Sequence, residues 1–410
     1  MLQLQVINFR KGSYIVVEGK EDSANFYIIQ QGTVRSQKVY GGMPPVNYGP
    51  GDFVGVVPCM SGHAQIETAV AVTDVVAISV RKEQYPELIS QNTPVALKII
   101  KTFSNRMRVM NEMLSKATLK STTRDDYEQL FYVGQFYEKA RMNNVAAFAY
   151  YQYLKTHPTS ENLEIAKQRF VALKQTAHPV FLESTPDLTR AYPKNTMIFS
   201  EAQSGADMFI IQQGEVTISK IVDGNVVTFA ILGKGDMFGE MALLENKPRS
   251  ASAIAHSDCV LMVVNRSNFN QMVSTQPQMI AKLTTTLADR LWSMYRNLDN
   301  ANIVDPLFKM LDMLLLQLEK QRKHIDFHSA LKQPYQTEYT PLDLANMCGI
   351  PSENQPLAIG KFMQEPNFQI QKEKIFIKDM LELAKQVAFL KKQQAISNSI
   401  NNSEKATGVL

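Results

Sequence analysis

The chain has 410 residues, of which 45% are hydrophobic and 20% charged, and its formal net charge is +4. This length predicts several domains, and the composition excludes a disordered or fibrous protein. The small net charge points neither to nucleic acid nor to a membrane surface. The three cysteines lie far apart without a CxxC pair, which indicates a reducing compartment with no disulfide framework and no metal site.

The sequence shows no sign of export or membrane insertion. Its first residues, MLQLQVINFRKGSYIVVEG, lack the long apolar core of a signal peptide. The longest apolar candidate, MLDMLLLQL, is too short to span a bilayer. We therefore expect a cytoplasmic protein without membrane contact.

Two segments, one near the start and one near the middle of the chain, repeat each other. FYIIQQGTV at 26–34 returns as MFIIQQGEV at 208–216, and GPGDFVG at 49–55 returns as GKGDMFG at 233–239. Each copy alternates β-rich segments with glycines and is followed by a helical pattern. The sequence thus predicts two copies of one antiparallel β-domain, each with helices after it.

The segment between the copies has a helical pattern of its own. Residues 127–160 span 34 positions and match the spacing of a tetratricopeptide repeat at Leu130, Gly134, Tyr137, Ala146, Tyr150 and Pro158. One such repeat cannot bury its own apolar face, so we expect it to pack on a neighbouring module or to bind a protein partner. The alternative is a helical spacer.

A candidate binding site lies in GEMALLENKPRSASA at 239–253, which follows a predicted strand and opens a short helix. Helix-start N–H groups suit a phosphate, and Arg249 adds a permanently charged donor fork. Glu240 has acceptor oxygens for ligand hydroxyls, and the small residues from Ser250 to Ala253 let a ligand approach the backbone. An anion together with a diol describes a nucleotide. The alternative is a surface turn with an ordinary ion pair.

The longer stretch FGEMALLENKPRSASA at 238–253 resembles the phosphate-binding cassette of cyclic nucleotide-binding domains, as found in catabolite-activator and FNR-like regulators. The resemblance implies a jelly-roll-like β-roll in which Glu240 holds the ribose 2′-hydroxyl and Arg249 holds the cyclic phosphate. It also implies base contacts from Met294 and Tyr295, although core or dimer-interface roles are the alternative for both. The expected ligand-binding residues are Phe238, Gly239, Glu240, Met241, Ala242, Arg249, Ser250, Ala251 and Tyr295.

The resemblance leaves the purine open. Ser250, just after the cassette arginine, occurs with either base, so it does not decide between cyclic AMP and cyclic GMP. We expect cyclic AMP, with cyclic GMP or another cyclic nucleotide as the alternative and no further cofactor.

The first copy departs from this pattern. GVVPCMSGHAQIETAVA at 55–71 aligns without a gap to the second cassette and places Val56 opposite Glu240 and Gln65 opposite Arg249. Ile66 and the acidic Glu67 stand opposite Ser250 and Ala251. We therefore expect a degenerate N-terminal copy with a structural or interface role; another ligand is the alternative.

The C-terminal region resembles the dimer helix and winged helix-turn-helix of the same regulators, through the helical pattern at 276–325 and YTPLDLANMCGIPSENQPLAIGKFMQ at 339–364. The resemblance implies a homodimer and DNA contacts from Ser352, Asn354, Gln355 and Lys361, with Ser352 as a helix cap. Residues 337–385, however, carry five lysines, no arginine and seven acids, the wrong sign for a DNA surface.

The predicted architecture is a multidomain α+β chain. Its predicted parts are a degenerate cyclic nucleotide-binding-like domain (1–115), a tetratricopeptide-like segment (121–176), a cyclic nucleotide-binding domain (177–275), a dimer-type helical region (276–325), a winged-helix-like domain (330–388) and a disordered tail (389–410). We expect a ligand-gated transcription regulator; the alternative is a protein-interaction regulator without DNA binding. No HExxH, nucleophile elbow or Walker loop is present, so we expect no enzyme activity and no catalytic residues.

Overall fold

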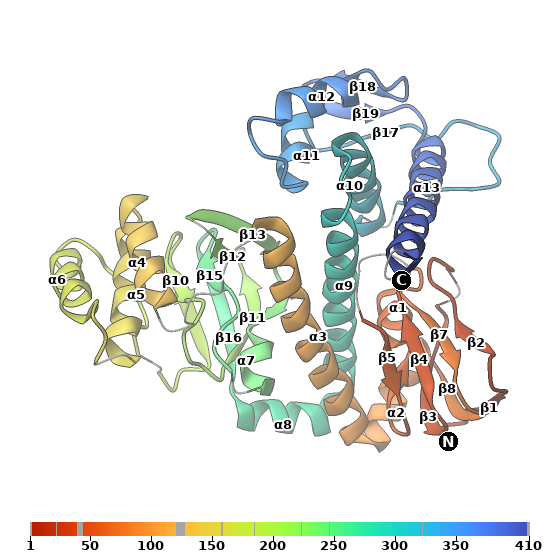
Figure 1. Ribbon diagram of the computed structural model, residues 1–410. Coiled ribbons are helices and arrows are strands. Elements are labelled where there is room, and N and C mark those ends of the chain that lie inside the picture. The colour runs from red at the N-terminus through yellow and green to blue at the C-terminus, as the bar shows by residue number, and fades with distance from the viewer. Residues whose placement is uncertain are drawn as a thin grey trace. The chain divides into compact units, whose positions relative to one another are not determined.

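The computed structural model describes residues 2–21, 23–38, 44–119, 128–156, 159–183, 185–222, 224–245, 247–321 and 323–407 (Figure 1). The chain forms two compact units that do not follow chain order. One unit is formed by Glu83–Asp289, and the other combines Gln3–Lys82 with Arg290–Leu410. The helices after the N-terminal β-domain thus belong to the unit that contains the C-terminal β-domain.

The first unit begins with helices. They are α2 (Tyr85–Gln91), α3 (Thr93–Leu119), α4 (Gln129–Lys139), α5 (Asn143–Thr156) and α6 (Leu163–Lys174). Helix α4 packs on α5, and α5 on α6, as the yellow helices of Figure 1 show. Gly134 lies against the ring of Tyr150, and both positions belong to the predicted 34-residue pattern. Pro158, the last position of that pattern, lies outside the described residues.

The β-roll of this unit consists of two four-stranded antiparallel sheets. One sheet contains, in spatial order, β14 (Met237–Phe238), β11 (Met208–Gln213), β16 (Cys259–Val264) and β9 (Thr189–Tyr192). The other contains β10 (Met197–Phe199), β15 (Ser252–Ala255), β12 (Val216–Val222) and β13 (Asn225–Leu232). Phe199, Phe209 and Phe238 pack together between them. Helix α7 (Glu240–Glu245) and helix α8 (Arg266–Thr275) complete the domain, and α3 packs against α7.

The N-terminal β-roll, in the second unit, has the same strand order, which confirms the predicted repeat. One sheet contains β1 (Gln5–Phe9), β8 (Val75–Arg81), β3 (Asn25–Gln31) and β6 (Phe53–Val54). The other contains β2 (Tyr14–Val16), β7 (Thr68–Ala71), β4 (Val34–Gln37) and β5 (Val46–Tyr48), and helix α1 (Val56–Ser61) follows β6.

The glycine of the repeated QQG motif shows why the motif recurs. Gly32 and Gly214 have φ of 91° and 81°, and a Cβ atom on either would lie within 2.3 Å of a backbone oxygen, that of Asp74 or Asp258. Only glycine combines this backbone conformation with so close an approach.

Two helices lead from the second β-roll toward the C-terminus. Helix α9 (Pro277–Ala301) belongs to the first unit up to Asp289 and to the second unit from Arg290. Helix α10 (Pro306–Lys320) starts after the N-cap Asp305, whose side chain accepts a hydrogen bond from Phe308 N. The predicted helical region at 276–325 is therefore two helices, separated where Asp305 caps the second.

A small α/β module follows. It contains β17 (Tyr335–Gln336), α11 (Pro341–Met347), α12 (Gln355–Met363), β18 (Phe368–Gln371), β19 (Lys374–Ile377) and α13 (Met380–Thr407). The predicted cap at Ser352 is wrong, because α12 begins at Gln355 after Asn354 and carries Pro356 in its first turn. Proline is tolerated there because first-turn N–H groups have no helical acceptor.

The predicted disordered tail from 389 is also wrong within the described residues, because α13 continues through Thr407. Lys391 in this helix pairs with the buried Asp312, a long-range contact that a polar composition does not reveal. Residues 408–410 of the predicted tail lie outside the described residues. No helix of the described chain is long and apolar enough to cross a membrane.

Candidate functional site

The predicted cassette lies in the first unit, between β14 and β15. The backbone conformation of Gly239 lets the start of the cassette contact Arg249 near its end. Gly239, just before α7, has φ of 81°, and a Cβ on it would stand 2.9 Å from Arg249 Nη1. The carbonyl of Gly239 accepts a 2.7 Å hydrogen bond from that same nitrogen. The glycine is thus required both by its left-handed backbone and by the space that the arginine takes.

Arg249 is held by its backbone and enclosed by its neighbours. Its N–H donates to Gln203 O and its carbonyl accepts from Ala202 N, at 2.9 and 2.8 Å. Its guanidinium carbon lies 4.2 Å from the ring centroid of Phe199, within cation–π range. Only 7% of the residue is exposed, and its buried Nε has no hydrogen-bond partner among the described residues. A buried charged donor without an acceptor is costly, so this atom is well placed for an anionic ligand.

The electrostatics keep this arginine charged. Burial lowers the pKa of Arg249 to about 10, and the carboxylates of Asp207 and Glu240 partly offset that effect. The guanidinium is therefore protonated at neutral pH. Glu240 is itself 3% exposed at the start of α7, so the acceptor and the donor predicted for a diol and a phosphate are both enclosed.

The remaining cassette residues line the same segment. Phe238 and Ala242 are 1% exposed, Ala251 is 8% exposed, and Met241 and Ser250 are half-buried, with Ser250 Oγ 3.7 Å from Met241 Sδ. The structure thus brings eight of the nine predicted ligand-binding residues together.

Reasoning from the sequence missed Asp207 and Phe199, which both act on Arg249. Aligning the two repeats could have pointed to Asp207, because the N-terminal copy has Asn25 at the position where the second copy has Asp207. The carboxylate is thus present only in the copy that has the arginine. Nothing in the spacing indicates the contact with Phe199, since β10 and the cassette turn meet only in the folded roll.

A cavity of about 380 Å³ in the same unit reaches Arg249 from the side of α5. Phe148 and Gln152 of α5, the loop at Gly205, and Phe199 line it together with Arg249, whereas Glu240 does not. The cavity therefore reaches Arg249 but not Glu240.

Comparison with known proteins identifies this arrangement. Residues 6–92 and 189–276 each match the cyclic nucleotide-binding domain family. The chain carries two cyclic nucleotide-binding domains. The cassette lies within the second match, and the degenerate copy at 55–71 lies within the first.

The relatives of these domains include regulators. The cyclic AMP receptor protein of Thermus thermophilus is 34% identical over 103 residues, which cover 25% of this chain and 48% of that protein. The CRP-like cAMP-activated global transcriptional regulator of Mycobacterium tuberculosis is 26% identical over 195 residues, covering 47% of this chain and 85% of that protein. The solved structure of a CooA mutant from Carboxydothermus hydrogenoformans matches 48% of this chain and 87% of its own, with 16% identity and a TM-score of 0.39.

The cassette of the first cyclic nucleotide-binding domain keeps the backbone but not the ligand groups of the second. Gln65 N donates to Lys20 O and Gln65 O accepts from Gly19 N, and the backbone of Arg249 makes the equivalent pair of hydrogen bonds. The carboxylate of Glu67 accepts a 2.5 Å hydrogen bond from Ser36 Oγ. A phosphate at this cassette would meet that carboxylate and an amide in place of the guanidinium.

Tyr295 is the predicted ligand residue that does not belong to the unit of the cassette. It belongs to the second unit, is 4% exposed, and has Lys38 Nζ 5.3 Å from its ring centroid. Its contact with a base remains a prediction.

The four predicted DNA-binding residues lie at α12 and the turn before it. Ser352, Asn354 and Lys361 are exposed, whereas the side-chain amide of Gln355 donates to Asn346 Oδ1 and to Ile350 O, both at 2.9 Å. The Gln355 amide thus ties α12 to the turn after α11 and is not turned outward.

Proposed function

We propose that this chain is a cyclic nucleotide sensor that binds one molecule of cyclic AMP, at the cassette of its second domain. The observation that supports this most directly is the buried guanidinium of Arg249, whose Nε has no acceptor in the part of the chain that the structure describes. The ligand's cyclic phosphate would accept from this arginine, and its ribose hydroxyl would donate to Glu240. Charge-assisted hydrogen bonds in a site that excludes water supply both affinity and orientation. We further propose that the site binds its ligand without hydrolysing it.

The test is isothermal titration of the full chain with cyclic AMP and, separately, with cyclic GMP. We expect one site per chain and tighter binding of cyclic AMP. Two sites per chain would contradict our proposal that the first domain binds no cyclic nucleotide. No heat with either nucleotide would refute the sensor function. Chromatography of the ligand after long incubation should recover it unchanged.

For the output we propose regulation of transcription by a cytoplasmic homodimer, with the C-terminal module as a winged-helix DNA-binding domain. The similarity to a cAMP-activated transcriptional regulator supports this reading. Ligand binding would act through a difference in affinity between two positions of the helices after the second domain. A steep loss of duplex-DNA binding with rising salt would be the expected signature, because phosphate contacts release counterions.

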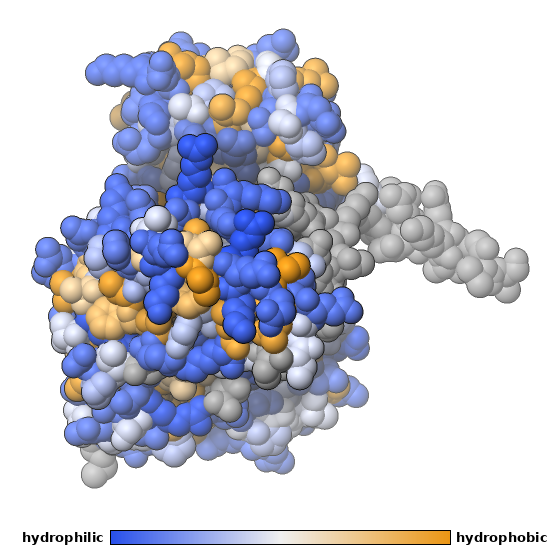
Figure 2. Space-filling model, turned by 90° about the vertical axis from the view of Figure 1, so that its left-hand side faces the viewer, coloured by the Kyte–Doolittle hydropathy of each residue, from blue (hydrophilic) through white to orange (hydrophobic). Residues whose placement is uncertain are grey.

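A protein partner is the second candidate, and the surface of α12 favours it. Lys361 is the only cation among residues 355–363, all of which are described, while Leu357 and Met363 are 67% and 40% exposed. Figure 2 shows orange side chains at the top of the view, where the C-terminal module lies. Exposed apolar side chains on a helix suit a protein surface better than a phosphate backbone. The tetratricopeptide-like helices α4 and α5 would offer a further protein contact. DNA binding that is absent at every salt concentration would favour this second candidate.

A further inference from the structure

The second half of α9 packs on the cassette turn of the first, degenerate domain. Trp292 is 3% exposed, and its indole stacks on the imidazole of His63, with 3.9 Å between the ring centroids and 18° between the planes. The indole Nε1 also donates a 3.2 Å hydrogen bond to Ala64 O. His63 and Ala64 belong to the turn between α1 and β7, immediately before Gln65. The aromatic side chain therefore covers the part of the first cassette that corresponds to the turn before Arg249 in the second.

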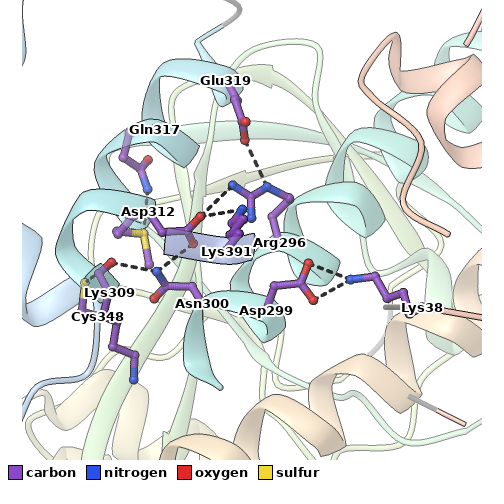
Figure 3. Close-up of polar contacts among 11 residues, drawn as sticks. Lys38, Arg296, Asp299, Asn300, Lys309, Asp312, Gln317, Glu319, Cys348 and Lys391 are labelled. Carbon is purple, nitrogen blue, oxygen red and sulfur yellow. Dashed lines mark hydrogen bonds and ion pairs between the residues drawn. The ribbon is translucent and has the colours of Figure 1, made fainter. Parts of the chain in front are cut away.

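A second contact fixes the same helix to the same domain. Lys38, one residue past the end of β4, donates to both carboxylate oxygens of Asp299, at 2.5 and 2.7 Å (Figure 3). The side chain of Lys38 is only 4% exposed and that of Asp299 13% exposed, and the same ammonium lies near the ring of Tyr295. Trp292, Tyr295 and Asp299 are spaced by three and four residues, so they lie on one face of α9.

The ion pair is informative because a lysine is almost never so completely buried without a partner. Taking its charge out of water is unfavourable, and the bidentate contact with Asp299 compensates for it. Such a pair is specific, since a helix without this carboxylate would leave a buried charge behind. The first domain thus presents a stacking surface, a carbonyl acceptor and a buried cation that match three side chains of one helix.

We propose that the ligand of the first cassette is α9 of its own chain, with Trp292 in the role that a nucleotide has in a competent domain. The domain lost the groups that hold a cyclic nucleotide, since Val56 and Gln65 replace the glutamate and the arginine. At the same cassette turn it has the contacts that hold a helix. The degenerate domain is an intrachain helix-binding module, and its function does not depend on a small molecule.

Helix α9 is also held by polar contacts with α10, so its docking on the first domain affects the helices that follow it. Arg296 donates to Asp312 Oδ1 and to Glu319 Oε2, at 3.2 and 3.1 Å, and Lys391 of α13 lies 2.8 Å from the same Asp312 oxygen (Figure 3). Asp312 is fully buried. Through α9, the first domain therefore steadies α10, which precedes the C-terminal module, and α13, the last helix of that module.

The test uses Trp292 itself, because it is the only tryptophan in the chain. In the wild-type protein we expect short-wavelength emission and weak quenching by acrylamide, as for an enclosed indole. Lys38→Glu places a carboxylate opposite Asp299 and should undock the helix, shifting the emission to longer wavelength and raising the quenching. The double variant Lys38→Glu with Asp299→Lys reverses the pair and should restore the wild-type spectrum. Lys11→Glu, at an exposed site of the same domain, is the matched control and should change nothing.

Three results would overturn the proposal: wild-type emission typical of an exposed indole, a Lys38→Glu spectrum equal to that of the wild type, or a charge reversal that restores nothing while circular dichroism shows a folded chain. Titration of the wild-type chain with cyclic AMP gives an independent answer. A second site per chain, lost on replacing residues of the first cassette and kept in Arg249→Ala, would show that the first cassette takes a nucleotide, and would also refute the proposal. A wild-type chain that binds no nucleotide would refute the sensor function and leave the docking of α9 intact.

Discussion

Replacing Arg249 by alanine is the sharpest test of the cassette. The change removes the donor fork that faces the proposed phosphate, together with the 2.7 Å hydrogen bond to Gly239 O. A charge-assisted hydrogen bond contributes about 1.5–3 kcal/mol. At about 1.4 kcal/mol per factor of ten, the dissociation constant for cyclic AMP should rise by about 10- to 150-fold. We expect the upper half of this range, because Arg249 is 7% exposed and solvent screens the contact little.

The assay is isothermal titration with cyclic AMP, performed alongside thermal melts so that a loss of folding is not mistaken for a loss of affinity. Arg249→Lys should also weaken binding, since a point charge does not reproduce the planar fork. Gln65→Ala is the matched control, at the equivalent position of the first domain, and should leave the affinity unchanged. An Arg249→Ala chain with the wild-type melting temperature and the wild-type dissociation constant would refute the site.

Three further predictions concern stability. Burial raises the pKa of Glu201 to about 7. The contribution of this carboxyl group to stability is therefore complete below its unfolded-state pKa and is lost as pH rises through 7. Urea titrations should show Glu201→Gln to be more stable than wild type by about 3 kcal/mol at pH 8 and nearly equal to it below pH 5. Gly134→Ala places a methyl group 2.6 Å from the Tyr150 ring and should lower the free energy of unfolding by about 1–3 kcal/mol. Gly360→Ala on α12 has open space around it and should raise the free energy of unfolding by about 0.5–1 kcal/mol. Thermal melts in which both variants shift the melting temperature in the same direction would contradict this reasoning. Asp312→Asn leaves Arg296 with Glu319 as its remaining carboxylate and removes the partner of the half-buried Lys391. It should cost about 3 kcal/mol in chemical unfolding. A loss below about 1 kcal/mol would show that Glu319 or water replaces the lost carboxylate.

The β-rolls and the cassette were predictable because their signals are local. The QQG and PGD or KGD motifs recur wherever a turn requires a glycine, and the strands between them follow from alternation of apolar residues. Short-range patterns of this kind survive folding unchanged. Eight of the nine predicted ligand residues lie in the one segment 238–251, so a correct prediction of the turn and helix placed them together.

Two of the misjudged features depended on contacts between distant parts of the chain, and one on a nearby proline. The tail from 389 is polar, as a disordered segment would be, yet it continues as a helix and Lys391 finds Asp312, some eighty positions earlier in the sequence. Ser352 has the chemistry of a cap, but Pro356 places the helix start at Gln355. Asp207 escaped notice because its role depends on the strand that brings it to Arg249.

The amino-acid sequence by itself contains the duplication, the presence of Glu240 and Arg249 in the second cassette and their absence from the first. Each of these follows from which residue stands at an aligned position. Which helices pack on each β-roll depends on the tertiary structure. Helix α3 lies with the second β-roll and the end of α9 with the first, an exchange that follows from which apolar faces and buried charges fit together in three dimensions. An indole at position 292 has no meaning in the sequence until the fold places it on His63. The tertiary structure thus decided what the degenerate domain binds, because the contacts of Lys38 and His63 with α9 form only in the folded chain.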